Sequence, residues 1–221
     1  MKLSPRLLLL VCCGLLITFR VIGQSPVPRV DAAAAEAPKA SALGLVQAGL
    51  DQIGKTLIYD AAYVTLTYPN GDVPIERGVC CDVVIRALRA GGVDLQKLIH
   101  EDMAKNFSAY PKLWGLSKTD KNIDHRRVPN MAKFFTRQGK SLPVTKEAKD
   151  YKPGDFVVCS LPNELIHIML VSTKLTDAGV PYIIHNIGAG AREEDRLFEF
   201  KIEGHFRWYP EATKTAEKPK P

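Results

Sequence analysis

The sequence lacks the motifs and the charge excess that mark several common classes of function. It contains no Cys-x-x-Cys pair and no His-Glu-x-x-His run, which argues against a zinc site of either common kind. No internal repeat is visible. The formal net charge of +6 falls to +3 without Lys2, Arg6 and Arg20, since 27 basic residues then stand against 24 acidic ones. Such a small excess of positive charge gives no support for a nucleic-acid partner.

Acidic residues are also missing from the first 23 positions. Lys2 and Arg6 stand at the start of the apolar run Leu7 to Phe19, and the small Gly23 follows at a plausible cleavage position. This pattern is typical of an export signal, and the run is shorter than the ~20 residues of a membrane-spanning helix. We therefore expect a periplasmic or secreted protein with no stable membrane insertion after cleavage. Arg20 disturbs the cleavage region, so an uncleaved anchor is the alternative.

Composition divides the chain into four parts. Hydrophobic and charged contents of 46% and 24% are those of a globular protein, but two segments cannot supply a core: a Pro- and Ala-rich stretch and a Lys/Glu/Pro/Thr tail. We expect a signal peptide at 1–23, a flexible linker at 24–40, one domain at 41–210 and a disordered tail at 211–221.

Three cysteines remain beyond the leader: Cys80, Cys81 and Cys159. An odd number in an oxidising compartment implies at least one free thiol. Cys80 or Cys81 could pair with Cys159, whereas a bridge between the adjacent Cys80 and Cys81 would be strained. A bridged Cys81 leaves Cys80 free, but a bridged Cys80 excludes it as a nucleophile.

The spacing of apolar residues changes from helical to strand-like near Pro153. Helices are predicted from Ser41 to Gly54 (with Leu43, Val46, Leu50 and Ile53 on one face), from Cys80 to Gly91, after Asp94, and from Pro129 to Gly139. Strands are predicted at 156–161, 166–171, 182–187 and 197–209. Helices followed by a strand meander indicate an α+β fold with an antiparallel sheet.

Cys80 is the strongest candidate for chemistry because it begins a predicted helix. Free N–H groups and the partial positive charge at a helix start favour a thiolate, and Gly78 just before it allows a close approach of substrate. His167 and His185 occupy neighbouring strands in which an apolar residue would be the default. If these strands pair, His167 is placed as general base and His185, or Asn186 on the opposite face, as its orienting group. The alternative is that each histidine is a core residue whose hydrogen bonds are made within the fold, which is the more common role of a lone histidine in a strand.

Several longer motifs then resemble the bacterial family called domain of unknown function 1287 (DUF1287, YijF-like). The resemblance covers about residues 45 to 209 and is carried by Tyr59-Asp60, Tyr68-Pro69-Asn70-Gly71-Asp72, Gly78-Val79-Cys80, His100-Glu101-Asp102-Met103, Asn122-Ile123-Asp124-His125-Arg126-Arg127 and His185-Asn186-Ile187-Gly188.

More distantly, the order Tyr59, Cys80, His167, His185 is similar to that of the NlpC-type peptidases, which have a papain-like core. That resemblance implies a papain-like α+β fold and an amide in cell-wall peptide (peptidoglycan) as substrate. The chain departs from the pattern at Cys81, where Thr or Ser is expected, at Met169 in place of a small Gly, and at Cys159 in place of an aromatic residue.

Five further residues are candidates for substrate or oxyanion binding: Tyr59, Cys81, Asp82, Arg126 and Asn186. Backbone N–H groups after Cys80 could hold an oxyanion, and Tyr59 could donate its hydroxyl or simply pack. The Asp124–Arg127 segment is either a solvated turn or a polar wall that binds a carboxylate.

These observations predict an exported cysteine amidase or peptidase that acts through a thioester on Cys80 and needs no cofactor. The alternatives are a catalytically silent cell-wall-binding or scaffolding module, and a metal-dependent hydrolase. For the latter, His100, Asp102, Asp124, His125 and His205 offer ligand chemistry.

Overall fold

The structure is a computed structural model that describes residues 41–209. The expected signal peptide and linker, as well as the expected tail, lie outside these residues. Within 41–209, no helix is both long enough and apolar enough to cross a membrane.

The described chain is an α+β fold, as the sequence predicts. Its helices are α1 (Ala42–Leu50), α2 (Cys80–Ala90), α3 (Leu95–Asn106) and α4 (Val128–Arg137), with 3-10 turns η1 (Phe107–Ala109), η2 (Asp124–Arg126) and η3 (Ala148–Asp150). Its strands are β1 (Ile58–Tyr59), β2 (Arg77–Gly78), β3 (Ser141–Leu142), β4 (Phe156–Ser160), β5 (Ile166–Leu175), β6 (Pro181–Asn186), β7 (Ala191–Glu194) and β8 (Lys201–Phe206).

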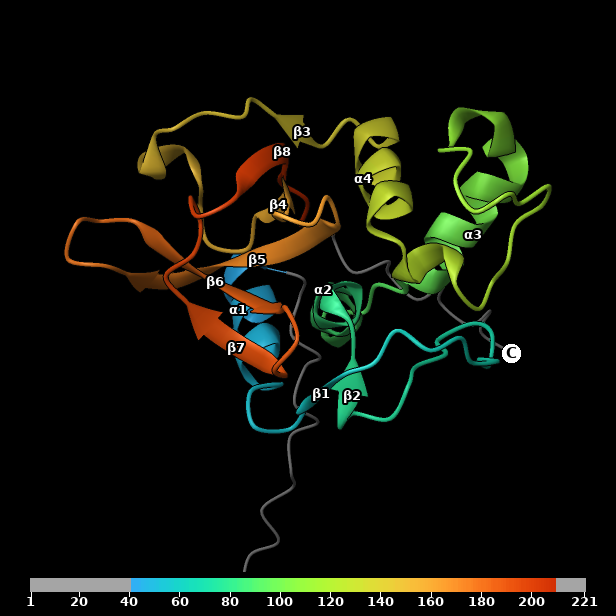
Figure 1. Cartoon of the computed structure of the whole chain (residues 1–221), viewed down its shortest axis with the longest axis horizontal. Helices are drawn as coiled ribbons and strands as arrows, with labels where there is room; N and C mark the ends of the chain where they lie inside the picture. The colour runs from blue at the N-terminus through green and yellow to red at the C-terminus, as the bar shows by residue number, and fades with distance from the viewer. Residues whose placement is uncertain (1–40, 210–221) are drawn as a thin grey trace, which may run out of the picture. The chain divides into compact units, whose positions relative to one another are not determined.

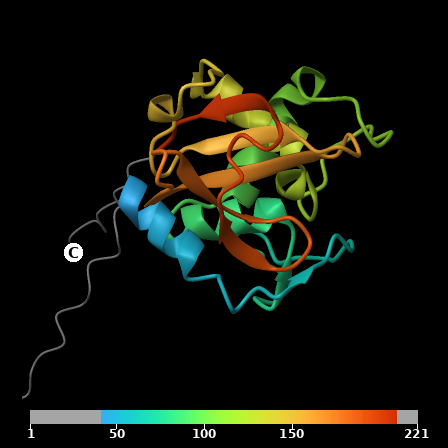
Figure 2. The ribbon, with the colours of Figure 1, turned by 60° about the vertical axis from the view of Figure 1, so that its left-hand side comes forward.

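Six strands form one antiparallel sheet in the order β3-β8-β4-β5-β6-β7. Helices α1 and α2 pack against β5 and β6 on the same face of this sheet (Figures 1 and 2). The strands β1 and β2 form a separate parallel pair, with Tyr59 beside Gly78. This pair brings Tyr59 next to the segment that leads into α2.

Helix α1 begins where the sequence predicts but presents a different face. The Ser41 hydroxyl accepts a hydrogen bond from the Gly44 N–H (3.1 Å), which is the usual N-cap interaction. The buried residues are Leu45, Val46 and Gly49, whereas Leu43 is exposed. Gly49 suits this orientation: a Cβ there would lie 2.8 Å from a methyl group of Leu170, so a larger residue would require the Leu170 side chain to shift.

The sequence prediction misses two short strands of the sheet and misplaces the start of another. Strand β7 has the sequence Ala-Arg-Glu-Glu, and its lack of apolar alternation explains why it was not predicted. Strand β3 contains only two residues. The last strand begins at Lys201 rather than Leu197, because Leu197 lies before the strand and is buried against the sheet face opposite the helices.

Aromatic residues of α4 complete the core between the helices and the sheet. Phe135 is fully buried and stacks on Phe156 with ring centroids 5.2 Å apart. It also contacts Phe206 on β8 (5.5 Å between centroids). This packing fixes α4, and therefore the turn η2 that precedes it, relative to the sheet.

We expect Phe135→Ala to lower the free energy of unfolding by about 3–5 kcal/mol, because it leaves a cavity between α4 and the sheet. Phe198, which is 38% exposed, provides the matched control, and Phe198→Ala should cost less than about 1 kcal/mol. Urea denaturation of both variants measures the difference. Equal losses would mean that α4 does not depend on this contact.

Candidate active site

Cys80 is the first residue of α2 and is held there by several backbone contacts. The Val79 N–H donates to the Asp82 carboxylate (2.6 Å), which closes the first turn of the helix. The Gly78 carbonyl accepts hydrogen bonds from the Asn186 side-chain amide (2.9 Å) and the Asp60 N–H (3.1 Å). Strand β6 and the β1 segment therefore both fix the chain two residues before Cys80.

Asn186 holds the Gly78 segment in place and does not orient the histidines. While its amide nitrogen donates to Gly78, its side-chain oxygen accepts from the Gly188 N–H (3.1 Å). Of the two orienting groups that the sequence leaves open, only His185 contacts His167.

Strands β5 and β6 pair, and the two histidines meet across them. The distance between His167 Nε2 and His185 Nδ1 is 2.9 Å, and both rings are buried. The other nitrogen of His185, Nε2, lies 2.7 Å from a carboxylate oxygen of Glu194 on β7. Glu194, His185 and His167 thus form a continuous chain of hydrogen bonds across three adjacent strands.

The carboxylate at one end of this chain determines where the protons are. Because the Glu194 carboxylate only accepts, His185 Nε2 carries the proton, and in the neutral ring Nδ1 is then an acceptor. His167 must therefore donate through Nε2, which leaves Nδ1 of a neutral His167 without a proton. Burial lowers the pKa of His185 to about 4, which keeps this ring neutral near pH 7.

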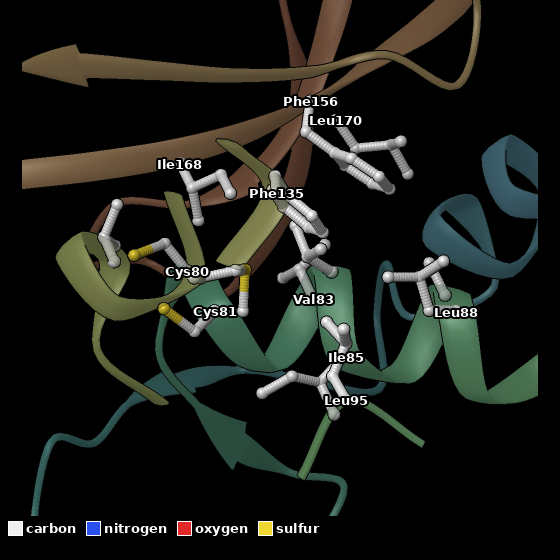
Figure 3. Close-up of a cluster of buried hydrophobic side chains, with 14 of the residues drawn as sticks. Cys80, Cys81, Val83, Ile85, Leu88, Leu95, Phe135, Phe156, Ile168 and Leu170 are labelled. Carbon is white, nitrogen blue, oxygen red and sulfur yellow. The ribbon is translucent and has the colours of Figure 1, made fainter. Parts of the chain in front are cut away.

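The environment of Cys80 favours the thiolate. The neighbouring Cys81 thiol lowers the pKa of Cys80 most, and His167 and the Ile168 backbone lower it further against the opposing effect of burial. The Cys81 thiol has a raised pKa because it is buried and lies beside the Cys80 sulfur. Figure 3 shows both cysteines at the start of α2, beside buried residues such as Val83 and Ile168.

Cys80, Cys81 and Cys159 are all free thiols in the structure. Cys159 stands directly opposite His167 in the pairing of β4 with β5. Burial raises its pKa to about 12, so Cys159 is an inert thiol next to the site. Among these three thiols, only Cys80 has a lowered pKa.

Asp82 and Arg126 face each other rather than a ligand. The Arg126 guanidinium makes two hydrogen bonds of 2.9 Å to the Asp82 carboxylate, and their side chains are only 2% and 3% exposed. Arg126 also donates to the carbonyls of Asp60 and Ala62. Both were expected to bind substrate or oxyanion, but the pair instead joins α2, η2 and the segment after β1.

The structure also changes the expectations for the η2 segment and for the Asp82 N–H. Asp124, His125 and Arg126 are buried, so η2 is not a solvated turn. The Asp82 N–H donates to the Val79 carbonyl (3.0 Å), which removes it as an oxyanion donor. The N–H groups of Cys80 and Cys81, in the first helical turn, remain candidates.

Cys80 opens into a pocket with a volume of about 320 Å³. Tyr59, Trp114, Arg127 and Leu165 contribute to its walls. Burial and the nearby negative charge of Cys80 raise the pKa of Tyr59 to about 12, so its hydroxyl remains a donor. Residues 41–209 contain no group of three or more His, Cys, Asp or Glu side chains placed to hold a metal ion.

The sequence analysis does not single out Glu194, Trp114 or Leu165, and it includes Arg127 only as part of the Asp124–Arg127 segment. A signal for Glu194 existed: the Gly188-Ala189-Gly190 turn after β6 indicates a hairpin, and hence a strand paired with the one that carries His185. Arg127 gave no separate signal, because sequence alone does not distinguish it from its neighbour Arg126.

The chain belongs to the family described as "Domain of unknown function (DUF1287)", whose sequence profile matches residues 46–208. It is 57% identical over 167 residues to the "Uncharacterized protein YijF" of Escherichia coli (strain K12), covering 76% of this chain and 82% of that relative. No solved structure matches it. The family membership indicated by the sequence motifs is confirmed.

We expect Arg126→Ala to lower the free energy of unfolding by about 3–5 kcal/mol, because it leaves the Asp82 charge buried without a partner. The exposed pair of Arg77 with Asp60 (3.0 Å) is the matched control, and Arg77→Ala should cost less than about 1 kcal/mol. Thermal and urea denaturation measure both. A loss for Arg126→Ala no larger than that of the control would contradict a buried ion pair.

Proposed function

We propose that this protein is a cysteine hydrolase in which Cys80 is the nucleophile and His167 the general base. The observation that carries this proposal is the buried chain from Glu194 through His185 to His167. It ends at a histidine that lowers the pKa of the helix-start cysteine. A nucleophile, its base and a group that orients the base are the three parts that thiol-based acyl transfer requires.

In the first step, His167 takes the proton of Cys80 and the thiolate attacks the carbonyl carbon of an amide. The new C–S bond gives a tetrahedral oxyanion. As the oxyanion collapses, the C–N bond breaks, and protonated His167 transfers its proton to the departing amine. The acyl group remains on Cys80 as a thioester.

In the second step, His167 removes a proton from water, and the hydroxide attacks the thioester carbonyl. The C–S bond breaks, the acid product leaves, and the Cys80 thiolate is restored with His167 protonated. His185 holds the His167 ring in place through both steps, and Glu194 fixes the tautomer of His185.

Three donors near Cys80 are suited to the oxyanion. The N–H groups of Cys80 and Cys81 lie in the first turn of α2, where helix geometry leaves them without an intrahelical acceptor. The Tyr59 hydroxyl lines the same pocket and stays protonated. Donors arranged in advance around a developing negative charge are usually the largest single contribution to such catalysis.

The class of substrate follows from the N-terminal export signal and the distant resemblance to NlpC-type peptidases. An exported thiol hydrolase with a papain-like arrangement, in which a helix-start cysteine packs on an antiparallel sheet that carries the histidine, is suited to amide bonds in cell-wall peptides. The periplasm or cell exterior would give it access to that substrate.

We expect iodoacetamide to label Cys80 rapidly at pH 6, because His167 and Cys81 stabilise its thiolate. His167→Ala should slow this labelling about tenfold or more by returning the Cys80 pKa toward its free value. Glu194→Gln should slow it less, and Glu193→Gln, which changes the adjacent residue of β7, should leave it unchanged. Mass spectrometry assigns the labelled cysteine; a Cys80 that titrates like a free thiol in the unaltered protein would refute the proposal.

We further expect the purified protein to cleave an amide in a mixture of peptidoglycan peptides, with new carboxyl and amino ends detected by mass spectrometry. Cys80→Ser should abolish cleavage, whereas Cys159→Ser should retain it, because Cys159 is not part of the proton chain. If the mixture is bound but never cleaved, and Cys80→Ser binds it equally well, the protein is a binding module instead.

A further inference from the structure

Arg127 is a pocket residue whose charged group has no hydrogen-bond partner among residues 41–209. The neighbouring Arg126 uses its guanidinium on Asp82 and on two backbone carbonyls. Arg127 makes no such contacts, although its side chain is only 17% exposed and its Nη1 atom is fully buried. Two adjacent arginines therefore differ: one is saturated by the protein and the other is not.

The nearest carboxylate does not satisfy Arg127. Asp124 Oδ1 lies 3.8 Å from Nη1, which is within ion-pair range but too long for a hydrogen bond. Oδ1 itself has no hydrogen-bond partner, while Oδ2 accepts from the Asp120 N–H (2.5 Å). Burial raises the pKa of Asp124 and lowers that of Arg127, so both charges are held in a poorly solvated place.

Trp114 holds the guanidinium from one side. The Trp114 ring centroid lies 4.1 Å from the Arg127 Cζ atom, which is a cation–π contact. Trp114 and Leu165 are nevertheless 49% and 60% exposed and line the same pocket as Cys80. The pocket thus combines an arginine that makes no side-chain hydrogen bond within residues 41–209 with apolar walls next to the thiol.

Size and charge limit what can bind there. Of the two arginines in the lining of this pocket, Arg126 is hydrogen-bonded to Asp82, whereas Arg127 has only the 3.8 Å ion pair with Asp124. Glu164 also lines the pocket and would disfavour a group with several negative charges more than a single carboxylate. A volume of about 320 Å³ fits an amino-acid-sized group, and a planar carboxylate matches the fork of a guanidinium.

We propose that Arg127 binds a carboxylate of the substrate close to the scissile amide, and that Trp114 and Leu165 contact the carbon chain that carries it. This inference rests on the proposed function of Cys80, and it assigns to the enzyme a preference for acidic peptides over neutral ones. Arg127 is then a specificity residue whose guanidinium donates to the substrate carboxylate.

The test compares two thiol reagents that share a reactive group and differ in the end of a short chain, a carboxylate or a methyl group: 2-carboxyethyl methanethiosulfonate and its neutral propyl analogue. With either reagent, the Cys80 thiolate attacks the sulfenyl sulfur, forms a disulfide and expels methanesulfinate. Because the chemistry and the thiolate fraction are the same for both, the ratio of the two rates measures recognition of the carboxylate. Mass spectrometry confirms that Cys80 is the modified residue.

We expect Arg127→Gln to lower the ratio of carboxyethyl to propyl rates by about tenfold, which is typical for loss of a charged hydrogen bond. The matched control is Lys133→Gln, which removes one positive charge from α4, the helix that Arg127 precedes, at a residue outside the pocket lining, and it should leave the ratio unchanged. Arg127→Lys should give an intermediate value. The effect should persist at 0.5 M NaCl, since a direct contact is screened less than a distant charge.

The inference is overturned if Arg127→Gln changes the ratio no more than Lys133→Gln does, in protein that unfolds at the same temperature as the unaltered chain. Failure of the proposed function gives a different result. In that case the neutral reagent reacts with the unaltered protein no faster than with a free thiol at pH 6, whatever the ratio between the reagents.

Discussion

The ion pair between Asp82 and Arg126 is the contact on which the geometry around Cys80 depends. Asp82 belongs to the first turn of α2, and Arg126 to η2, which is 44 residues later in the chain. Arg126 also donates to carbonyls beside Tyr59, so one guanidinium joins three segments that are distant in sequence. Buried charges without a partner carry a large energetic penalty. The start of α2, the Tyr59 segment and η2 can therefore occupy only a narrow range of relative positions.

The sheet adds a second constraint from the other side of Cys80. Antiparallel pairing sets the spacing of β5, β6 and β7, so that each hydrogen bond of the Glu194–His185–His167 chain joins neighbouring strands. The tether from Asn186 to Gly78 links this sheet to the segment that enters α2. Cys80 is thus positioned by the helix and His167 by the sheet, and β6 supplies contacts to both.

The sequence predicted those parts of the structure that local chemistry determines. The helices that start at Ser41 and Asp94 could be predicted because a helix cap needs only a short-range side-chain contact, and both residues are caps in the structure. The face of α1 was predicted wrongly, since the close approach at Gly49 depends on Leu170, a residue far away in sequence. Glu194 was missed for a related reason: β7 has no apolar pattern, and its role exists only once β6 and β7 pair. Long-range pairings of polar groups leave no periodic signal in a sequence.

Arg126 and Arg127 show why a residue type alone does not assign a role. Both follow Asp124 and both line the Cys80 pocket. The guanidinium of Arg126 meets a carboxylate that belongs to a helix start, and its donors are used within the fold. The guanidinium of Arg127 lies between an aromatic ring and a carboxylate 3.8 Å away, and it makes no hydrogen bond to a residue of the described chain. Proteins satisfy nearly all of their buried polar groups, so the partners of the two guanidinium groups, rather than the residue type, separate an arginine that holds the fold together from a candidate for ligand binding.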